Sequence, residues 1–463
     1  MDSTAETVYK CRAIITRRNA SEVLLLPQSA GWALPQVEVQ PHRRHAEQLT
    51  TGVRKEWGLT SYCLIPLRLQ DNEQNQCTGC TVLEAVESNG RAPQGAHWMP
   101  RAVAARCCEG RDASAIAELL TEMDTYAQSE NAGHFARPGW LRELFLWAQT
   151  QATSLGFRLT GGFQQLNASP TFSLVRLETN DRALWFKATG KPNTHELSIA
   201  TALARSFPQF VPEIVAVHKE WNGWLSLEAP GAPLDETRDL SSWTRAAETL
   251  AELQIASVGK TKALVEAGAK DLRSCNLTGE IHPFLSRMSE LMAAQEKPSP
   301  APLTESELGT LGERIKESCE LLQSLDIPDT LGHIDFNPGN ILVSQDSCVF
   351  LDWAEAAVTN PTVTFEYLRE HLRSCEFKEP SAGERLAAAY LGPWKAVCRT
   401  EEMQRALMVS PLLAVFVYAV ASQSWRSTDI AGDRKLAGYF RSLTRRMYRE
   451  VVRVEQGSEL CLG

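Results

Sequence analysis

Four side chains between residues 331 and 353 have the types and spacing needed for acid–base and metal chemistry. They are His333, Asp335, Asn340 and Asp352. Carboxylate and amide oxygens that converge on one point suit a hard divalent cation, above all Mg²⁺ carrying nucleotide phosphates. If Asn340 and Asp352 hold that metal, Asp335 is left to accept a proton from an incoming hydroxyl group.

The elements that must position these residues are two short apolar strands. Residues 341–343 and 348–351 are hydrophobic and are separated by a short polar turn, a pattern that predicts a β-hairpin. A hairpin brings its two open ends together. We therefore expect Asp335 and Asn340, at one end, to face Asp352 at the other.

The stretch LGHIDFNPGNILVSQDSCVFLDW resembles the aminoglycoside phosphotransferase family, which is related to the protein kinases. The resemblance implies that Asp335 is the catalytic base, that His333 brackets the loop, and that Asn340 and Asp352 hold Mg²⁺. It also implies ATP or GTP as the phosphate donor. Ile334 stands where the family usually has glycine. The alternative is that the acidic loop is only a solvated turn.

The same resemblance implies nucleotide-binding residues upstream. Lys187 lies on the third strand of a β-rich segment, and Glu196 begins the following helix, where the family pairs a lysine with an acid at the phosphates. The phosphate-covering turn at 167–169 lacks glycine, and Ser169 could donate its hydroxyl there. Glu228 marks the hinge that meets the base. Alternatively, Lys187 and Glu196 stabilise a strand end and a helix start.

The first quarter of the chain, roughly residues 6–125, resembles a Nudix hydrolase. The landmarks are W-x-L-P at Trp32 and a later W-x-P at Trp98. The catalytic helix of that family needs several carboxylates on one face to hold Mg²⁺. Here only Glu56 and Gly58 of that pattern remain. The resemblance therefore implies a domain without hydrolase chemistry, acting in packing, ligand sensing or dimerisation.

The sequence thus predicts an α+β multidomain chain. An N-terminal Nudix-like α/β/α sandwich at 1–126 and a linker at 127–139 precede a bilobal protein kinase-like phosphotransferase. Its N-lobe spans 140–231, and its helical C-lobe spans 232–463, including the catalytic hairpin 331–353.

Helix signals support this order. A periodic segment at 45–57 ends at Gly58, which predicts a helix with a glycine stop. A helix is predicted to start at Pro283 and to run to 294. Another is predicted at 305–324, opened by a capping box at Thr304.

Composition limits the class of protein. The chain has 463 residues, 43% of them hydrophobic and 22% charged, as expected for a soluble multidomain protein. Its net charge of -9 argues against nucleic acid as a partner and favours a cationic small substrate, unless it only keeps the surface soluble. The apolar segment 406–425 is long enough to raise the question of a membrane span. We predict a buried core helix and no membrane partner.

The 12 cysteines follow no disulfide framework, which predicts a reducing cytoplasm. Cys77 and Cys80 form a CxxC, with Cys107 and Cys108 downstream. A zinc knuckle would need a second pair of ligands at matching spacing, so ordinary reduced thiols are the preferred interpretation.

The function expected from these features is transfer of the γ-phosphate of ATP or GTP to a hydroxyl of a small molecule, with a cationic acceptor as one option. Glu355 and Glu366 are candidate acids for that acceptor, or else surface carboxylates. Three alternatives stay open: a pseudokinase-like nucleotide sensor, a Nudix-type diphosphate hydrolase, and a protein acceptor. The oligomeric state is not predicted.

Overall fold

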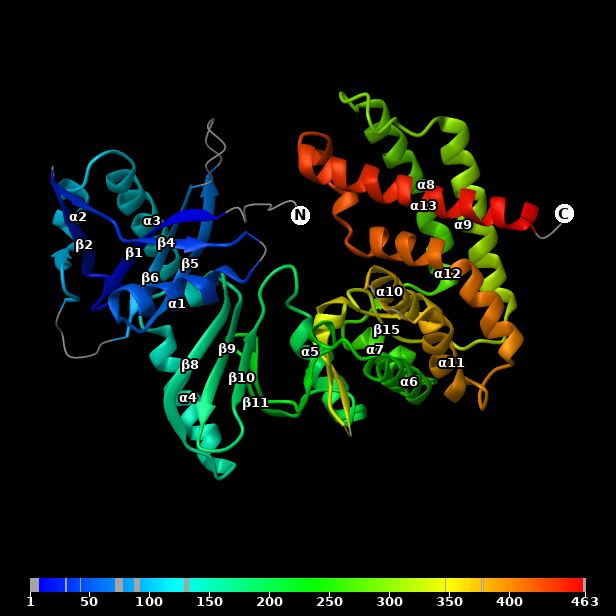
Figure 1. Cartoon of the computed structure of the whole chain (residues 1–463), viewed down its shortest axis with the longest axis horizontal. Helices are drawn as coiled ribbons and strands as arrows, with labels where there is room; N and C mark the ends of the chain where they lie inside the picture. Colours follow the sequence, from blue (N-terminus) through cyan, green and yellow to red (C-terminus); the bar gives the residue numbers. More distant parts are fainter. Residues whose placement is uncertain are drawn as a thin grey trace. The chain divides into compact units, whose positions relative to one another are not determined.

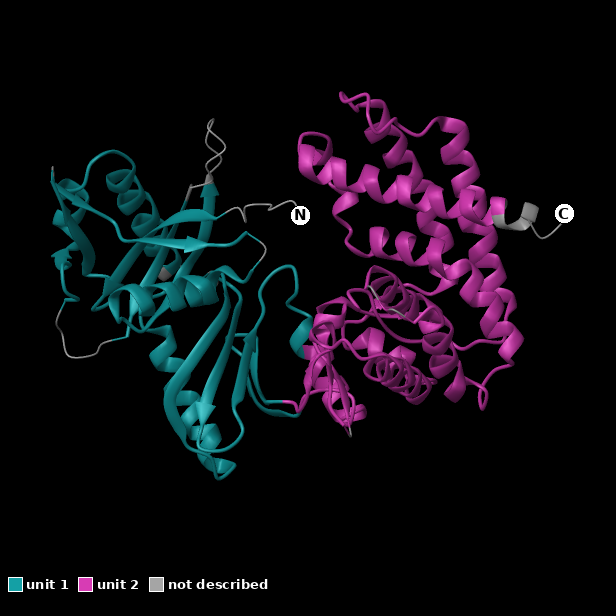
Figure 2. Cartoon of the chain, viewed as in Figure 1, with its two compact units in different colours: residues 1–197, 213–228 teal, residues 198–212, 229–463 magenta. Residues whose placement is uncertain are grey.

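The chain is an α+β protein that forms two compact units (Figure 2). Unit 1 contains residues 1–197 and 213–228, and unit 2 contains residues 198–212 and 229–463. The structure is a computed structural model that describes residues 8–29, 31–41, 43–70, 78–86, 92–128, 133–345, 347–375, 377 and 379–460.

Unit 1 begins with a subdomain, residues 8–128, built on a mixed sheet with helices on both faces (Figure 1). Alternate residues of the first strand point to opposite faces: Ala13 packs with Leu49 of the first helix, and Ile14 packs with Leu120 of the third. The strands are β1 (Tyr9–Arg17), β2 (Glu22–Gln28), β3 (Gly31–Ala33), β4 (Gln36–Val39), β5 (Ser61–Gln70), β6 (Thr78–Ala85) and β7 (His97–Pro100), in the order β3-β2-β1-β6-β5 with β4 on β1 and β7 on β2. The helices are α1 (His45–Trp57), α2 (Arg101–Cys107) and α3 (Gly110–Gln128).

The rest of unit 1 is an antiparallel sheet preceded by a helix. After η1 (His134–Ala136) and α4 (Trp140–Ser154) come β8 (Leu159–Ala168), β9 (Ser173–Thr179), β10 (Leu184–Ala188), β11 (Ile214–His218) and β12 (Gly223–Leu227), in the order β11-β12-β10-β9-β8. Helix α5 (Glu196–Ser206) follows β10. Phe135 packs edge-on against Trp140, Phe186 and Trp221, so the segment before α4 lies in the same core as the sheet. The described residues 133–139 of the predicted linker belong to unit 1, and the linker itself stays a prediction.

Unit 2 is mainly helical, with two small sheets that carry the loop of interest. Its helices are η2 (Leu234–Glu236), α6 (Leu240–Ser257), α7 (Thr261–Glu266), α8 (Ser274–Ala293), α9 (Glu305–Ser324), η3 (Pro338–Asn340), η4 (Trp353–Glu355), α10 (Pro361–Ser374), α11 (Ala382–Trp394), α12 (Thr400–Ala421), η5 (Ser424–Arg426), η6 (Thr428–Ala431) and α13 (Arg434–Leu460). One sheet has the order β13 (Ala232–Pro233), β16 (Ile341–Val343), β17 (Cys348–Phe350), and the other β14 (Lys270–Asp271), β18 (Ala356–Thr359), β15 (Thr330–His333).

Helix α12 covers most of the apolar segment that raised the membrane question. By length and composition alone it could cross a membrane, but 61% of its most apolar window is buried inside the protein. Its buried face includes Leu413, Phe416 and Val420, which join the same core as Phe284 of α8 and Phe440 of α13. Helix α12 therefore serves as a core helix of unit 2, as predicted.

Candidate active site

The predicted hairpin is present in the structure. Ile341 pairs with Phe350 and Val343 with Cys348 in antiparallel strands β16 and β17. At the open end, the Leu351 amide donates to the Asn340 carbonyl at 2.8 Å. Asn340 and Asp352 are thus brought to the same end of the hairpin. Strand pairing therefore places both residues at this end of the hairpin.

Asp335 lies in the loop between β15 and η3, and its side chain is exposed between buried neighbours. Its carbonyl oxygen accepts from the Asn337 amide at 2.9 Å and from Asn340 Nδ2 at 3.1 Å. These bonds hold the loop by its main chain, so the carboxylate takes no part in them. With its amide nitrogen committed to Asp335, Asn340 presents its Oδ1 as an acceptor, which is the atom that a cation would use.

Asp352 has an unusual backbone. Its φ is 60° and its ψ is 65°, in the left-handed region, which few residues other than glycine occupy. Such a conformation costs on the order of 1–3 kcal/mol and persists where the surroundings impose it, often at functional sites. The following residue, Trp353, is buried and donates from its indole nitrogen to the Phe350 carbonyl at 3.2 Å. This anchor fixes the turn, while the Asp352 side chain stays exposed.

The donor set of this loop fits Mg²⁺. Asn340 and Asp352 offer two oxygen ligands, and Mg²⁺ in nucleotide sites commonly takes one or two protein ligands together with phosphates and water. Within the described residues, no three His, Cys, Asp or Glu side chains form a group that could hold a metal by themselves. A site completed by phosphate oxygens agrees with that observation.

His333 is buried at the end of β15, just before Asp335. Its Nε2 lies 3.0 Å from the Leu351 carbonyl, which requires a proton on Nε2. Burial lowers the pKa of His333, so the ring is neutral at pH 7. Its Nδ1 is buried and has no hydrogen-bond partner in the part of the chain that is described. His333 therefore ties β15 to the residue before Asp352, and its role in the catalytic loop stays a prediction.

Lys187 and Glu196 form an ion pair in unit 1. Lys187 Nζ lies 2.5 Å from Glu196 Oε1, and the two side chains are only 14% and 2% exposed. On β10, Lys187 faces Leu174 of β9 and Trp224 of β12, and its Nζ lies 5.9 Å from the centroid of the Trp224 ring. The predicted pairing is therefore present, with the lysine held on a central strand of the sheet.

We expect Glu196→Ala to destabilise the fold by about 3–5 kcal/mol, because it removes the carboxylate that pairs with the largely buried charge of Lys187. The same variant should weaken nucleotide binding, since Lys187 would lose its fixed position. Urea unfolding and nucleotide titration of the same samples measure both effects.

The control for that prediction is Glu320→Ala. Glu320 pairs with Lys316 on the surface of α9, where the side chains are 58% and 66% exposed, and such pairs contribute about 0–1 kcal/mol. Equal destabilisation by the two variants would contradict a special role for the Lys187–Glu196 pair.

Ser169 caps the turn between β8 and β9. Its hydroxyl oxygen accepts from the Phe172 amide at 2.9 Å and from the Thr171 amide at 3.3 Å. These two bonds use the oxygen as an acceptor, and the hydroxyl proton can still be donated to a phosphate. The side chain thus shapes the turn, a role that sequence reasoning did not foresee.

Glu228 follows the last residue of β12 and is held by several internal bonds. Its carboxylate accepts from Arg176 at 2.6 and 3.1 Å, its amide donates to the Ala183 carbonyl at 2.9 Å, and its carbonyl accepts from Arg182. The Arg176 guanidinium lowers the pKa of Glu228. The Glu228 amide is therefore engaged within unit 1, while its carbonyl oxygen, which accepts from Arg182, can accept a second bond. A role for Glu228 in nucleotide binding stays a prediction.

The two acids suggested for an acceptor are already paired. Glu355 forms an ion pair with Lys270. Glu366 is buried and accepts from Arg369 at 2.8 Å and from Arg373 at 2.7 Å. Both carboxylates are therefore neutralised by neighbours within unit 2, which weakens the argument that they line a site for a cationic acceptor.

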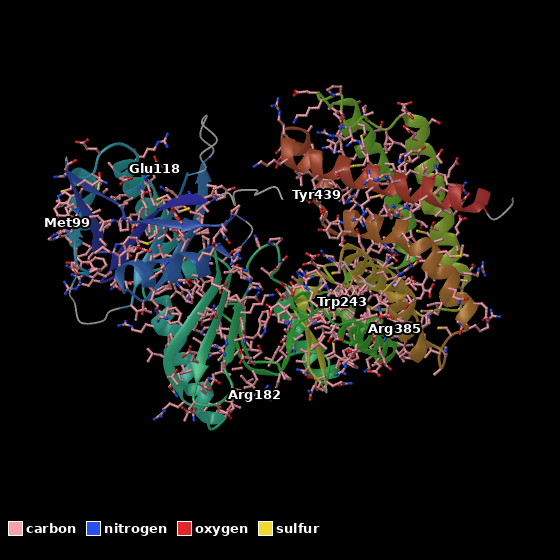
Figure 3. All side chains as sticks on the ribbon, viewed as in Figure 1. Met99, Glu118, Arg182, Trp243, Arg385 and Tyr439 are labelled. Atoms are coloured by element: carbon pink, nitrogen blue, oxygen red, sulfur yellow. The ribbon has the colours of Figure 1, made fainter. Side chains whose placement is uncertain are left out.

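Other residues near Asp335 were missed by sequence reasoning. Burial is the main cause of the raised pKa of Tyr367 in α10 and of Tyr439 in α13, and the Asp335 charge adds to both. The Asp335 charge also acts on the pKa of His371 in α10, as a smaller effect than burial. Tyr439 is 43% exposed (Figure 3). Burial lowers the pKa of His371, which leaves that ring neutral at pH 7. No local motif marks these residues, because they come from helices that only the tertiary fold brings near Asp335.

The cysteines do not form a metal site where the structure describes them. Cys80 and Cys107 are half-buried and Cys108 is buried, and all three are free thiols. Burial raises the pKa of Cys80 to about 12, so it stays protonated. Cys77, the other half of the CxxC, lies outside the described residues.

Comparison with known proteins finds a family model that matches the central part of the chain. Residues 187–398 match the phosphotransferase enzyme family, APH. This range contains Lys187, Glu196 and the whole loop from His333 to Asp352. None of the curated proteins matches the chain.

Several solved structures are similar to this one. A choline kinase from Cryptosporidium parvum has a TM-score of 0.47 and 13% identity, with 68% of this chain and 97% of that chain covered. A macrolide 2'-phosphotransferase from Brachybacterium faecium has a TM-score of 0.42 and 16% identity, covering 62% and 96%. A spectinomycin phosphotransferase in complex with ADP and its antibiotic has a TM-score of 0.42 and 12% identity, covering 67% and 98%.

Proposed function

We propose, on the premise that residues 187–398 carry a domain of the phosphotransferase enzyme family, that the protein moves the γ-phosphate of ATP or GTP to a hydroxyl group of a small molecule. The observation that carries this proposal is the loop in which the Asp335 carboxylate is exposed and uncommitted, while Asn340 is oriented by the Asp335 carbonyl at 3.1 Å. One short segment thereby holds both the proposed base, Asp335, and a proposed metal-binding residue, Asn340.

In this mechanism the Asp335 carboxylate orients the acceptor hydroxyl and takes its proton. The hydroxyl oxygen forms a bond to the γ-phosphorus as the bond from that phosphorus to the bridging oxygen breaks, and the nucleoside diphosphate leaves. Lys187, fixed by Glu196, would hold the α- and β-phosphates. Positioning of the two reactants supplies much of the rate, since phosphoryl transfer leaves little covalent work to the protein.

Asn340 and Asp352 would hold Mg²⁺, and the cation, when bound, neutralises charge on the phosphates. Ser169 would add a hydroxyl donor at the phosphate-covering turn. Cys63 and Cys80 are free thiols, which supports a cytoplasmic location, where thiols stay reduced.

These surroundings favour a small acceptor that carries a hydroxyl group and that need not carry several positive charges. Glu355 and Glu366 already form ion pairs within the protein, so their carboxylates are not left over to bind a polycation. Tyrosines 367 and 439 near Asp335 offer aromatic rings and hydroxyl groups, which suit sugars, amino alcohols and nucleosides alike.

We also propose that residues 8–128 have a Nudix-like fold without diphosphate hydrolysis. The mixed sheet covered by α1 on one face and by α2 and α3 on the other supports the fold. Helix α1 ends at Gly58 in the left-handed conformation, and its acid Glu56 is exposed beside Arg54 and Lys55. One carboxylate next to two cations is a poor Mg²⁺ site.

Transfer from γ-³²P-labelled ATP or GTP to a panel of sugars, amino alcohols, nucleosides and aminoglycosides tests the proposal. We expect label to appear in one small molecule, in proportion to the nucleoside diphosphate formed. A pseudokinase-like sensor would bind nucleotide without forming diphosphate, and a diphosphate hydrolase would give products with no acceptor present.

A further inference from the structure

The phosphate-covering turn between β8 and β9 is attached to the N-terminal subdomain by a buried side chain. Gln165 of β8, four residues before Ser169 at the start of the turn, is 1% exposed. Its Oε1 accepts from the Cys63 amide at 2.7 Å, and its Nε2 donates to the Cys63 carbonyl at 3.2 Å. The glutamine amide thus pairs with both main-chain groups of one residue of β5, as a neighbouring strand would.

Three further contacts hold the same hairpin. On the surface, Gln164 Nε2 donates to Glu47 of α1 at 2.7 Å. At the turn, the Phe135 amide donates to the Pro170 carbonyl at 3.0 Å. Ala168 packs against the core that α1 shares with the first sheet. Every one of these partners precedes α4 in the sequence, so the hairpin is held from segments outside its own sheet.

This arrangement gives the degenerate helix α1 a role. Its buried residues Ala46, Leu49 and Val53 face the first sheet, while Glu47 binds the β8 strand. Helix α1 therefore packs on the first sheet and contacts β8, whereas Lys55 and Glu56, in the segment where the resemblance would place hydrolase acids, are exposed. A turn without glycine has less freedom to wrap around phosphates, and a fixed frame compensates if it holds the turn in the binding conformation beforehand.

We propose that the N-terminal subdomain is a built-in brace for the β8–β9 hairpin, and that Gln165 is the positioning residue through which it fixes the phosphate-covering turn. The proposal rests on the phosphotransferase function proposed above. It explains why residues 8–128 and the second sheet share one compact unit.

The test uses the full chain with Gln165→Met, which keeps the length of the side chain and removes both bonds to Cys63. Its matched control is Gln164→Met on the same strand, where the amide is exposed and bonds only to Glu47 in the described structure. Hydrogen exchange of peptides covering residues 163–173 reports on the brace without any ligand. Calorimetric titration with Mg²⁺ and nucleotide reports on the positioning of the turn.

We expect exchange at the hairpin and the dissociation constant for Mg²⁺–nucleotide each to rise by about tenfold in Gln165→Met, the factor that corresponds to loss of one typical buried interaction. Gln164→Met should stay within about twofold of the wild type, as expected for an exposed pair. If Gln165→Met does not fold, Gln165→Asn, whose shorter amide cannot reach both main-chain groups of Cys63, takes its place with a rise of the same direction.

Unchanged exchange in Gln165→Met would overturn the brace. Faster exchange with unchanged affinity would overturn the positioning role. If the wild type binds no nucleotide, the proposed function fails, while the exchange experiment still decides whether the brace exists.

Discussion

Asp335→Asn is expected to lower turnover by about 10²–10⁴-fold, the usual contribution of a general base. The side chain keeps its size and loses its ability to take a proton. The loop should keep its shape, because its internal bonds run through the Asp335 carbonyl to Asn337 and Asn340 and not through the carboxylate. Nucleotide affinity should therefore stay near that of the wild type. Steady-state rates and calorimetric titration of the same variant separate the two quantities.

The matched control is Asp235→Asn. The carboxylate of Asp235 lies beside Gly339 of the same loop, with its Oδ2 3.3 Å from where a Cβ on that glycine would stand. It is a neighbouring acid to which no role in proton transfer is assigned. A loss of turnover in Asp235→Asn with none in Asp335→Asn would mean that the base has been assigned to the wrong carboxylate.

Asp352→Gly is expected to stabilise the protein without ligand and to abolish its metal-dependent nucleotide binding. Glycine occupies the left-handed region at no steric cost, whereas other residues pay about 1–2 kcal/mol there. The unfolding temperature should therefore rise. The affinity for nucleotide in the presence of Mg²⁺ should fall by at least about 100-fold, since even partners outside the metal's own ligands cost 10–100-fold.

Asp352→Ala separates these two effects, because it removes the carboxylate and keeps the backbone cost. It should lose the same affinity without the gain in stability. If Asp352→Gly is more stable and still binds Mg²⁺–nucleotide as the wild type does, the unusual backbone has no connection with metal binding.

The hairpin and its polar ends were predictable because the information is local. Two apolar strands and a short turn fix the register, and the register alone brings Asn340 next to Leu351 and Asp352. Helix α1 and its left-handed Gly58, and the capping box at Thr304, were predictable for the same reason.

Helix α8 begins at Ser274 and holds Pro283 in its interior. The expectation that this proline starts the helix was wrong, since the helix absorbs it.

Long-range pairing could not be predicted. Nothing near Glu355 indicates that Lys270 neutralises it, because the two residues meet only where β14 and β18 pair. Gln165 has no local feature that marks it as buried. Tyr439 belongs to α13, which lies about a hundred residues downstream of the loop. Its position near Asp335 depends on how α13 packs on α12. The positions of these residues, to which we assign acceptor choice and rigidity as proposals, are set by tertiary packing and not by a local motif.

Thermal unfolding of the wild type, Asp335→Asn and Asp352→Ala, each with ATP or GTP and with or without Mg²⁺, tests the central claim most directly. A ligand present at 100 times its dissociation constant stabilises the folded state by about 2.7 kcal/mol. We predict an upward shift with one nucleotide that needs Mg²⁺, is retained in Asp335→Asn and is lost in Asp352→Ala. No shift of the wild type with either nucleotide, or an equal shift in Asp352→Ala, would contradict the account.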